Sequence, residues 1–335
     1  MEMEKKFKVY VYGEGEQPLV HDGPCKDLYT IEGRFIHELD LGNTRYRTHD
    51  AHRAHVFFMP FSVAKLVKLT YHFDYDLSPI YKVVYDYIKV ISTKHPFWNR
   101  TQGSDHFMLS CHDWGPDASK SDPFLHNYSI RVFCNANYSE GFDPRRDVSM
   151  PEIHLYTGAL PPQLAQPPLE TALRPHLAFF AGGVHGPIRP ILLQNWGLKD
   201  KDLLVYEYLP KGLDYYTLML NSKFCLCPSG HEVASPRIVE AIYSECVPVI
   251  ISECYVLPFS DVLRWEKFSV RVPVADIPRL KEILKGVTDD EYKRLKEGVK
   301  AVKPHFMLNK PAKRFDVFHM ILHSIWLRRL NARLR

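Results

Sequence analysis

Short runs of apolar residues alternate along this chain with longer stretches in which apolar positions recur every three or four residues. In the first half, the apolar runs lie at residues 7–12, 55–59, 106–110 and 130–134. The stretches with helical spacing lie between them, at residues 27–39, 62–69 and 78–92. Short runs predict buried strands, and the longer spacing predicts amphipathic helices. This alternation is typical of an α/β domain with a mostly parallel sheet covered on both faces.

The alternation stops at a proline-rich segment and then starts again. Residues 160–168 predict an extended linker that suits neither helix nor strand. Beyond it, strands are predicted at residues 177–180, 203–206, 224–227 and 247–251. Helices are predicted at residues 188–196, 215–220, 236–244, 280–284, 290–302 and 312–327. We therefore divide the chain into a first domain (1–160), a linker (161–172), a second domain (173–310) and a C-terminal helix (311–335).

Composition and charge narrow the class of protein without identifying it. The 335 residues correspond to roughly two domains. The net charge is only +4, and no block of lysine and arginine stands out, which argues against a dedicated nucleic-acid binder. No apolar run reaches the ~18 residues needed to cross a bilayer.

The cysteines and the glycosylation motifs bear on the compartment. Seven cysteines form no metal-binding pattern, and we expect Cys225 and Cys227 to be ordinary buried thiols in an apolar strand. The odd count leaves at least one thiol unpaired within the chain. Asn99, Asn127 and Asn137 each begin an N-x-[ST] motif, and three such motifs within about forty residues favour a protein of the secretory pathway.

The most informative loop is predicted between a strand and a helix at residues 227–240. Ser229 lies in it, Ser235 is a good helix N-cap, and a proline follows at the first helical position. Free amides at that helix start, together with Arg237, would attract a phosphate. Glu240 lies one turn later and could accept hydrogen bonds from two ribose hydroxyls. The alternative is a local ion pair between Arg237 and Glu240.

Two further loops in the second half have chemistry that suits a nucleotide. Gly183 belongs to a glycine-rich turn after a predicted strand, and Arg189 begins the next helix. Glycines there would let a ligand approach the backbone, and the arginine would clamp a diphosphate, although a plain tight turn explains the pattern equally well. Tyr206 or Tyr208 could stack on a base, but aromatic residues at strand ends favour packing in the core.

In the first half, candidate catalytic residues follow the strand predicted at residues 106–110. His112 and Asp113 lie at its carboxyl end, beside Trp114, which could support a sugar ring. Either residue could be the general base that deprotonates an acceptor hydroxyl. A hydrogen-bonded pair that fixes the loop is an equal alternative. Three residues after the first strand meet the same positional condition as the base: Glu14, Glu16 and His21.

Metal and dinucleotide motifs are weak by comparison. Two D-x-D triplets occur, at residues 74–76 and 200–202, in loops that nothing else marks as catalytic. We therefore expect no metal site. No G-x-G-x-x-G follows a predicted strand, which argues against a dehydrogenase.

Four blocks of the chain closely resemble the exostosin-like glycosyltransferases, glycosyltransferase family forty-seven. They are residues 7–39 (FKVYVYGEGEQPLVHDGPCKDLYTIEGRFIHEL), 105–116 (DHFMLSCHDWGP), 222–263 (SKFCLCPSGHEVASPRIVEAIYSECVPVIISECYVLPFSDVL) and 313–331 (KRFDVFHMILHSIWLRRLN). The resemblance is strongest to the plant cell-wall branch, near the xylogalacturonan xylosyltransferase-like members. It implies a GT-B fold, in which two Rossmann-like domains face each other across a cleft and the C-terminal helix packs back on the first domain.

The resemblance also implies the activity and the location. We expect an inverting enzyme that needs no metal and transfers a sugar from a UDP-sugar, such as UDP-xylose, UDP-galactose or UDP-arabinose, to a wall polysaccharide such as pectin. Donor-site positions that match the family are Gly183, Arg189, Ser229, Ser235, Arg237 and Glu240. Family members are Golgi type II membrane proteins whose anchor and stem precede the segment that begins here at Met1. Partners would be related transferases in homo- or hetero-oligomers, and the alternative function is a non-catalytic scaffold for an active paralogue.

Overall fold

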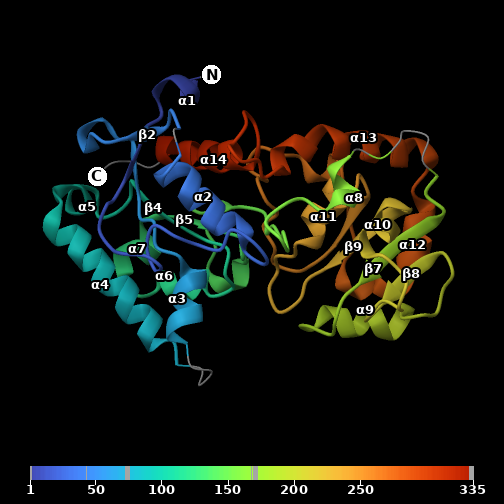
Figure 1. The fold of residues 1–335 in the computed structure, drawn as a ribbon. Coiled ribbons are helices and arrows are strands. Elements are labelled where there is room, and N and C mark those ends of the chain that lie inside the picture. Colours follow the sequence, from blue (N-terminus) through green and yellow to red (C-terminus); the bar gives the residue numbers. More distant parts are fainter. Residues whose placement is uncertain (1, 43, 72–75, 167, 169–172, 332–335) are drawn as a thin grey trace. The chain divides into compact units, whose positions relative to one another are not determined.

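The computed structural model describes residues 2–42, 44–71, 76–166, 168 and 173–331. It divides into two compact units, and chain order does not follow that division. Unit 1 comprises Met1–Gly158, Val256–Val262 and Leu308–Arg335, and unit 2 comprises Ala159–Tyr255 and Leu263–Met307 (Figure 1). Each unit contains its own parallel sheet, as the alternating pattern predicts.

Unit 1 is built on a six-stranded sheet in the order β2-β1-β3-β4-β5-β6. Its strands are β1 (Val9–Val11), β2 (Arg47–Thr48), β3 (Val56–Phe58), β4 (His106–Ser110), β5 (Ile130–Phe133) and β6 (Val148–Ser149). Every pairing is parallel, with Val9 opposite Val56 and Leu109 opposite Val132. The three strands at the centre, β3, β4 and β5, are buried throughout, which explains why most of their residues are apolar.

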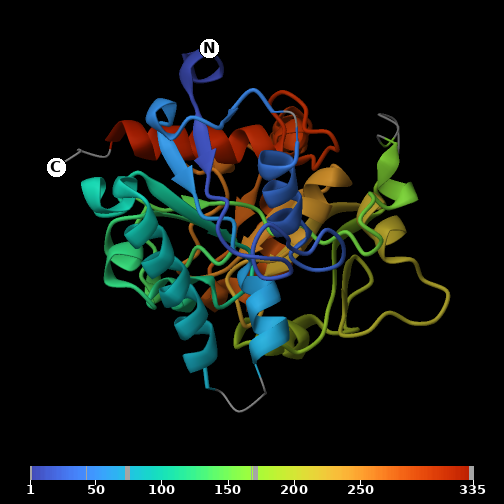
Figure 2. The ribbon, with the colours of Figure 1, turned by 60° about the vertical axis from the view of Figure 1, so that its left-hand side comes forward.

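Helices of unit 1 cover this sheet. The longer ones are α2 (Thr30–Asp40), α3 (Val63–Thr70), α4 (Ser78–Lys94) and α14 (Val317–Asn331), and the shorter ones are α1 (Glu2–Lys6), α5 (Pro96–Thr101), α6 (Gly115–Ser119) and α7 (Pro123–Asn127). In Figure 2, α3 and α4 run side by side. The C-terminal helix α14 packs on the first residues of the chain, because the rings of Phe7 and Trp326 lie 5.1 Å apart. Arg328 of the same helix donates to the carbonyl of Asp147 at 2.9 Å.

Unit 2 is built on a five-stranded parallel sheet in the order β11-β10-β9-β7-β8. Its strands are β7 (His176–Ala181), β8 (Leu203–Tyr206), β9 (Ser222–Pro228), β10 (Val247–Ile251) and β11 (Val270–Arg271). Its helices are α8 (Pro162–Ala165), α9 (Ile188–Trp196), α10 (Tyr215–Leu220), α11 (Arg237–Tyr243), α12 (Leu280–Gly286) and α13 (Asp289–Phe306).

Both sheets have the same topology. In each unit the first strand lies between the second and the third, so the order reverses beside the first strand. Such a reversal is the topological switch point of a doubly wound sheet, and ligands of this class of fold bind beyond the carboxyl ends of the strands there. The switch points lie between β1 and β3 in unit 1 and between β7 and β9 in unit 2.

Three sequence expectations about local structure need correction. The segment expected to be extended contains the short helix α8, while residues 167 and 169–172 of the predicted linker lie outside the described part of the chain. The last helix begins at Val317 rather than near residue 312. Asp316 explains the later start, because its carboxylate accepts from the amides of Lys313 and His319, as an N-cap does. Phe315 consequently lies off the helix and is exposed.

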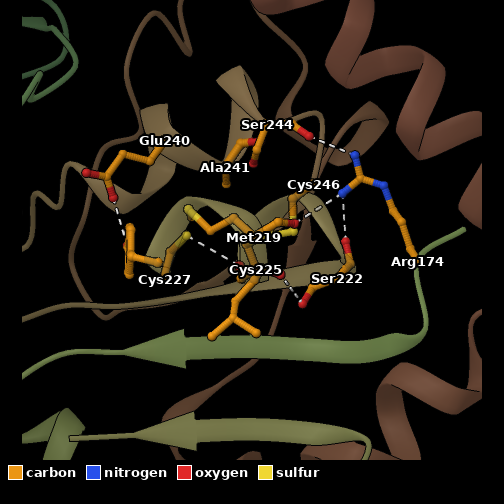
Figure 3. Close-up of a disulfide and its surroundings, with 11 residues drawn as sticks. Arg174, Met219, Ser222, Cys225, Cys227, Glu240, Ala241, Ser244 and Cys246 are labelled. Atoms are coloured by element: carbon orange, nitrogen blue, oxygen red, sulfur yellow. Dashed lines mark hydrogen bonds between the residues drawn. A yellow bond between two sulfur atoms is a disulfide. The ribbon is translucent and has the colours of Figure 1, made fainter. Parts of the chain in front are cut away.

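Cys225 is not a free thiol. It forms a disulfide with Cys246, the residue just before β10, so the bridge links β9 to the start of its neighbour β10. Figure 3 shows the bridge and its surroundings. Arg174 lies beside this bridge and donates to the carbonyls of Ser222 and Ser244, both at 2.7 Å. In unit 1, a second disulfide joins Cys111 and Cys134, which follow β4 and β5. Free cysteines among the described residues are Cys25, Cys227 and Cys254.

Candidate active site

Two loops meet at the switch point of unit 2. The β7–α9 loop (residues 182–187) follows β7, and the β9–α11 loop (residues 229–236) follows β9. Because β7 and β9 are adjacent parallel strands, both loops leave the same edge of the sheet. They come within contact of each other, since a side-chain carbon at Gly186 would collide with the carbonyl of Gly230.

Arg237 crosses from the start of α11 to the end of β7. Its Nε and Nη2 atoms donate to the carbonyl of Ala181 at 3.2 and 2.9 Å, and its guanidinium lies 5.1 Å from the centre of the Phe180 ring. A side chain at Gly182 would overlap this guanidinium. A glycine at position 182 is therefore what lets the arginine lie against the β7–α9 loop.

Arg189 reaches the same loop from α9. It is only 7% exposed, and its Nη1 atom donates to the carbonyl of Gly183 at 3.4 Å. A side-chain carbon at Gly230 would come within 2.9 Å of its guanidinium. The fold thus brings the two predicted arginines and Gly183 together, although the steric requirement for glycine falls on positions 182 and 230. No pattern in the sequence ranks those two glycines above Gly183.

Glu240 is buried one turn into α11 and is held by a tyrosine. Its Oε2 atom accepts a hydrogen bond of 2.8 Å from the hydroxyl of Tyr215, on α10. Burial, reinforced by the negative charge of Glu240, raises the pKa of Tyr215 well above its ordinary value, so the phenol remains a donor. Sequence reasoning missed Tyr215, because a tyrosine in a short apolar helix reads as a core residue.

The two serines of the β9–α11 loop differ from the prediction in part. Ser229 fixes the loop, since its hydroxyl donates to the carbonyl of Val233 and shares a hydrogen bond with the hydroxyl of Ser252. The prediction that Ser235 caps the following helix is wrong, because its buried hydroxyl has no hydrogen-bond partner among the described residues and α11 begins two residues later. Ser235 contacts the start of α11 through its backbone instead, because its carbonyl accepts from the amide of Ile238 at 3.2 Å.

Tyr208 also departs from expectation. Core packing was favoured for Tyr206 and Tyr208, but Tyr208 is 77% exposed and Tyr206 is half-buried. A side-chain carbon at Gly183 would lie 3.7 Å from the Tyr208 hydroxyl. An exposed aromatic ring thus lies next to the glycine-rich loop.

In unit 1, Asp113 lies at the carboxyl end of β4 and is oriented by Tyr29. Its Oδ1 atom accepts a hydrogen bond of 2.9 Å from the Tyr29 hydroxyl, and its backbone carbonyl accepts one of 3.1 Å from Asn135. Tyr29 has a φ of 61°, in the left-handed region that a bulky residue rarely adopts. The fold therefore strains Tyr29 while directing it to Asp113.

His112 is half-buried beside this pair. Burial lowers its pKa to about 4, so the imidazole is neutral at physiological pH. Its Nδ1 atom accepts a hydrogen bond of 3.1 Å from the amide of Trp114, which places the ring proton on Nε2. The Nε2 nitrogen already carries a proton, so it cannot take one from the hydroxyl of an acceptor sugar. Trp114 itself packs edge-on against Tyr71, with ring centres 4.6 Å apart.

A buried carboxyl supports the loop that carries these residues. Glu32, on α2, is fully buried and accepts from the amide of Cys111 at 2.8 Å and from the hydroxyl of Ser62. Burial raises its pKa above the ordinary range. Glu32 thus joins the start of α3 to the end of β4, and no sequence pattern predicts this role.

The alternative bases after β1 have their own partners. His21 lies beside the switch point of unit 1, where its amide donates to the carbonyl of Pro60. Its Nδ1 atom lies 2.7 Å from Oδ2 of Asp40, and this hydrogen bond raises the pKa of His21. Glu14 pairs with His95 at 2.7 Å, and Glu16 is exposed.

The family-forty-seven resemblance is confirmed by a domain match that covers most of the chain. Residues 3–287 match the exostosin GT47 domain. The chain belongs to the exostosin GT47 family of glycosyltransferases. The two parallel sheets are those expected of a GT-B member of this family.

Relatives of this GT47 chain are plant proteins. It is 60% identical over 335 residues to a probable glycosyltransferase of Arabidopsis thaliana, covering all of this chain and 70% of that protein. A second probable glycosyltransferase of the same plant is 59% identical over 336 residues, and the chain spans 64% of its length. A probable glucuronosyltransferase of Oryza sativa is 29% identical over 350 residues, covering 96% of this chain and 80% of that protein.

Among solved structures, the GT47 chain is similar to Anabaena HepE, crystallised in complex with UDP-glucose. The TM-score is 0.44 at 10% identity, over 94% of this chain and 97% of that one.

The D-x-D triplets of this GT47 chain have the following surroundings. Asp200 and Asp202 both pair with Lys281, at 2.5 and 3.1 Å. The other triplet begins at residues outside the described part of the chain, and its last member, Asp76, accepts from Ser78. Within the described ranges, no group of three or more histidine, cysteine or acidic residues is arranged to hold a metal ion. Nor does any helix there combine the length and apolar character that a bilayer crossing requires.

Proposed function

We propose that the chain transfers a sugar, with inversion, from a UDP-sugar to a hydroxyl of a plant cell-wall polysaccharide such as pectin. The observation that carries the proposal is the convergence of Arg189 and Arg237 on the glycine-rich loop at the switch point of unit 2. Two guanidinium groups beside exposed backbone suit a diphosphate, the chemistry of a nucleotide sugar.

The arginines would stabilise the leaving group. As the acceptor oxygen attacks the anomeric carbon, negative charge grows on the departing diphosphate. Arg237 and Arg189 now donate to the carbonyls of Ala181 and Gly183, so both are positioned before the donor arrives. Positioned charge of this kind is usually the largest catalytic contribution. Because it comes from side chains of the chain itself, we propose that turnover needs no divalent metal.

Glu240 and Ser235 complete the donor side. We propose that Glu240 accepts hydrogen bonds from the ribose hydroxyls, since Tyr215 already fixes its carboxylate. Ser235 retains an unused hydrogen-bonding hydroxyl in the same loop. Tyr208 offers an exposed ring near Gly183 on which the uracil base could stack.

For the base we propose Asp113, with His112 as a neighbour that does not titrate in the working range. His112 already carries its proton on Nε2, and Asp40 together with the carbonyls of Gly13 and Glu14 favours the charged form of His21. Glu14 is paired with His95 at 2.7 Å. Asp113 follows the central strand β4, and Tyr29 orients its carboxylate.

The resemblance to xylogalacturonan xylosyltransferase-like members favours UDP-xylose, followed by UDP-galactose and UDP-arabinose. The names of the rice relatives add UDP-glucuronate.

We further propose that the domain works in the Golgi lumen, as part of a type II membrane protein. Two disulfides within one chain support this, because disulfides persist in oxidising compartments and are rare in the cytosol. The glycosylation motifs point the same way.

The test is a panel of these four UDP-sugars, each assayed for hydrolysis and for transfer to pectin oligosaccharides, with and without a chelator. We expect turnover with at least one donor, unchanged by the chelator. Turnover that is lost in the chelator and restored by manganese would overturn the proposal that the reaction needs no divalent metal. Failure to bind UDP in calorimetry would overturn the catalytic proposal and favour a scaffold.

A further inference from the structure

Two glycosylation motifs of this chain are identical in sequence but differ in the folded structure. Residues 127–129 and 137–139 both read Asn-Tyr-Ser, only ten positions apart, and a third motif begins at Asn99. Their sequences alone give the two identical motifs the same chance of modification.

The side chain of Asn137 is part of the folded loop. Asn137 is 8% exposed, and its Oδ1 atom accepts from the amide and the hydroxyl of Ser139. Its Nδ2 atom donates to Glu140 at 2.8 Å. Asn135 donates both to Glu140 and to the carbonyl of Asp113. Because only 8% of Asn137 is exposed, a glycan on its Nδ2 atom would have to displace the groups packed around it, among them Glu140, which also holds Asn135 of the Asp113 loop.

Asn99 and Asn127 lie on the surface instead. Asn127 ends α7 and is exposed. Asn99, in α5, is also exposed, and its Nδ2 atom donates to the carbonyl of Ser92 at 2.8 Å. A glycosylated asparagine keeps one of its two amide protons, so this hydrogen bond can survive the modification.

Both asparagines line one polar hollow of about 630 Å³ in unit 1. The hollow is also lined by the arginines Arg100, Arg145, Arg146 and Arg328. Its segments precede β4, β5 and β6, so it lies at the amino ends of these strands. Asp113 follows the carboxyl end of β4. Sugars attached at the hollow would thus leave the opposite edge of the sheet open.

We propose that the folded protein carries N-linked glycans on Asn99 and Asn127 and none on Asn137. This rests on the lumenal location proposed above. The Nδ2 nitrogen bonds to the anomeric carbon of a lipid-diphosphate oligosaccharide, loses one proton, and the lipid diphosphate leaves. Transfer precedes folding, because Ser129 of the Asn127 motif is fully buried in the folded chain. Chains modified on Asn137 would then fail to fold.

The experiment is site mapping on the folded chain, secreted from eukaryotic cells behind a cleavable leader. Enzymatic deglycosylation in heavy-oxygen water marks each occupied asparagine as isotopically labelled aspartate. We expect label at positions 99 and 127 and none at 137. Label at 137, or its absence at 99 or 127, would overturn the proposal.

Three variants provide matched controls. Asn99→Gln and Asn127→Gln should each remove one glycan, so each variant should migrate one step faster on a gel than the parent. Ser139→Ala destroys the third motif while keeping Asn137 and its bond to Glu140, so mobility should not change; a shift would overturn the proposal. The natural protein, purified from the cells that make it, is mapped in parallel. If only the leader-driven protein is modified, the lumenal location is wrong and the assignment of sites stands.

Discussion

At the scale of single residues, the proposed donor site is tested best at Arg237, whose guanidinium donates to the carbonyl of Ala181. Replacing Arg237 with alanine should lower kcat/KM roughly 10- to 150-fold, because a charge-assisted contact contributes about 1.5–3 kcal/mol. Arg237→Lys should lose less than alanine but more than nothing, since lysine cannot hold two phosphate oxygens at once. Steady-state kinetics with the best donor measures both.

Arg237 also contacts Ala181 and Phe180, so each variant is first compared with the parent by thermal unfolding. If Arg237→Ala is folded and stays within about twofold of the parent, its phosphate role is wrong.

Asp113 gives a second residue-scale prediction. Asp113→Asn keeps the size of the side chain and can still accept from Tyr29. It removes the basicity, so turnover should fall ~10²–10⁴-fold while the Kd for UDP stays nearly constant. Retained turnover in this variant, combined with its loss in Glu14→Gln or His21→Ala, would place the base after β1.

The lowered pKa of His112 predicts how stability depends on pH. The folded state holds this imidazole neutral down to about pH 4, whereas the unfolded chain takes up the proton near pH 6.5. The unfolded state therefore binds more protons between these values, and the free energy of unfolding falls as the pH drops from about 6.5 to 4.

His112→Asn preserves an acceptor for the Trp114 amide and cannot titrate. Its unfolding free energy, measured with urea at several pH values, should fall less steeply over this window. Other histidines with lowered pKa, such as His55 and His323, act equally in both proteins, so the difference isolates His112. Identical slopes would contradict the prediction.

At the scale of secondary-structure elements, the bridge between β9 and β10 is the clearest stabilising feature. It closes a loop with a sequence separation of 21 residues. The double variant Cys225→Ala/Cys246→Ala should lose ~2–4 kcal/mol of stability, seen as a lower denaturant midpoint. Cys254→Ala removes an exposed free thiol and should stay within about 0.5 kcal/mol of the parent. Equal midpoints for the double variant and the control would count against the bridge.

Strands that a single pattern defines were predicted well. Residues 106–110 and 247–251 are strands with the predicted bounds, because buried parallel strands are mostly apolar. Residues 203–206 also match, although this edge strand is buried only at alternate residues. The strands β2, β6 and β11 have only two residues each, too few for any periodicity to show. Neighbouring strands, not local sequence, fix these edges.

The residues of the candidate site likewise divide into those that local sequence predicts and those that only the fold brings together. Arg189, Arg237 and Glu240 could be found because charged residues beside predicted strand ends are unusual. Tyr215 and Tyr29 could not, since each orients a carboxylate distant in sequence, and only the fold brings them together. The pairing of Cys225 with Cys246 was missed for the same reason.

At the scale of the whole molecule, we expect donor binding to protect unit 2 and not unit 1. Adding UDP should slow amide hydrogen exchange in the β7–α9 and β9–α11 loops of unit 2 and leave residues 111–114 unchanged. We would measure this on the full chain, because residues 256–262 and 308–335 belong to unit 1 and no single cut separates the units. Protection confined to unit 1 would refute the donor site.

The return of α14 to unit 1 has a consequence for the order in which the protein is made. Ribosomes release a chain from its amino end, so residues 1–158 emerge first, yet unit 1 also needs residues 308–335. The segments of unit 2 have all been synthesised by residue 307. The half that starts first is therefore completed last. Until α14 arrives, the ring of Phe7 and the carbonyl of Asp147 lack their partners Trp326 and Arg328. At ~5–20 residues per second, that delay leaves nascent apolar surface for chaperones to bind.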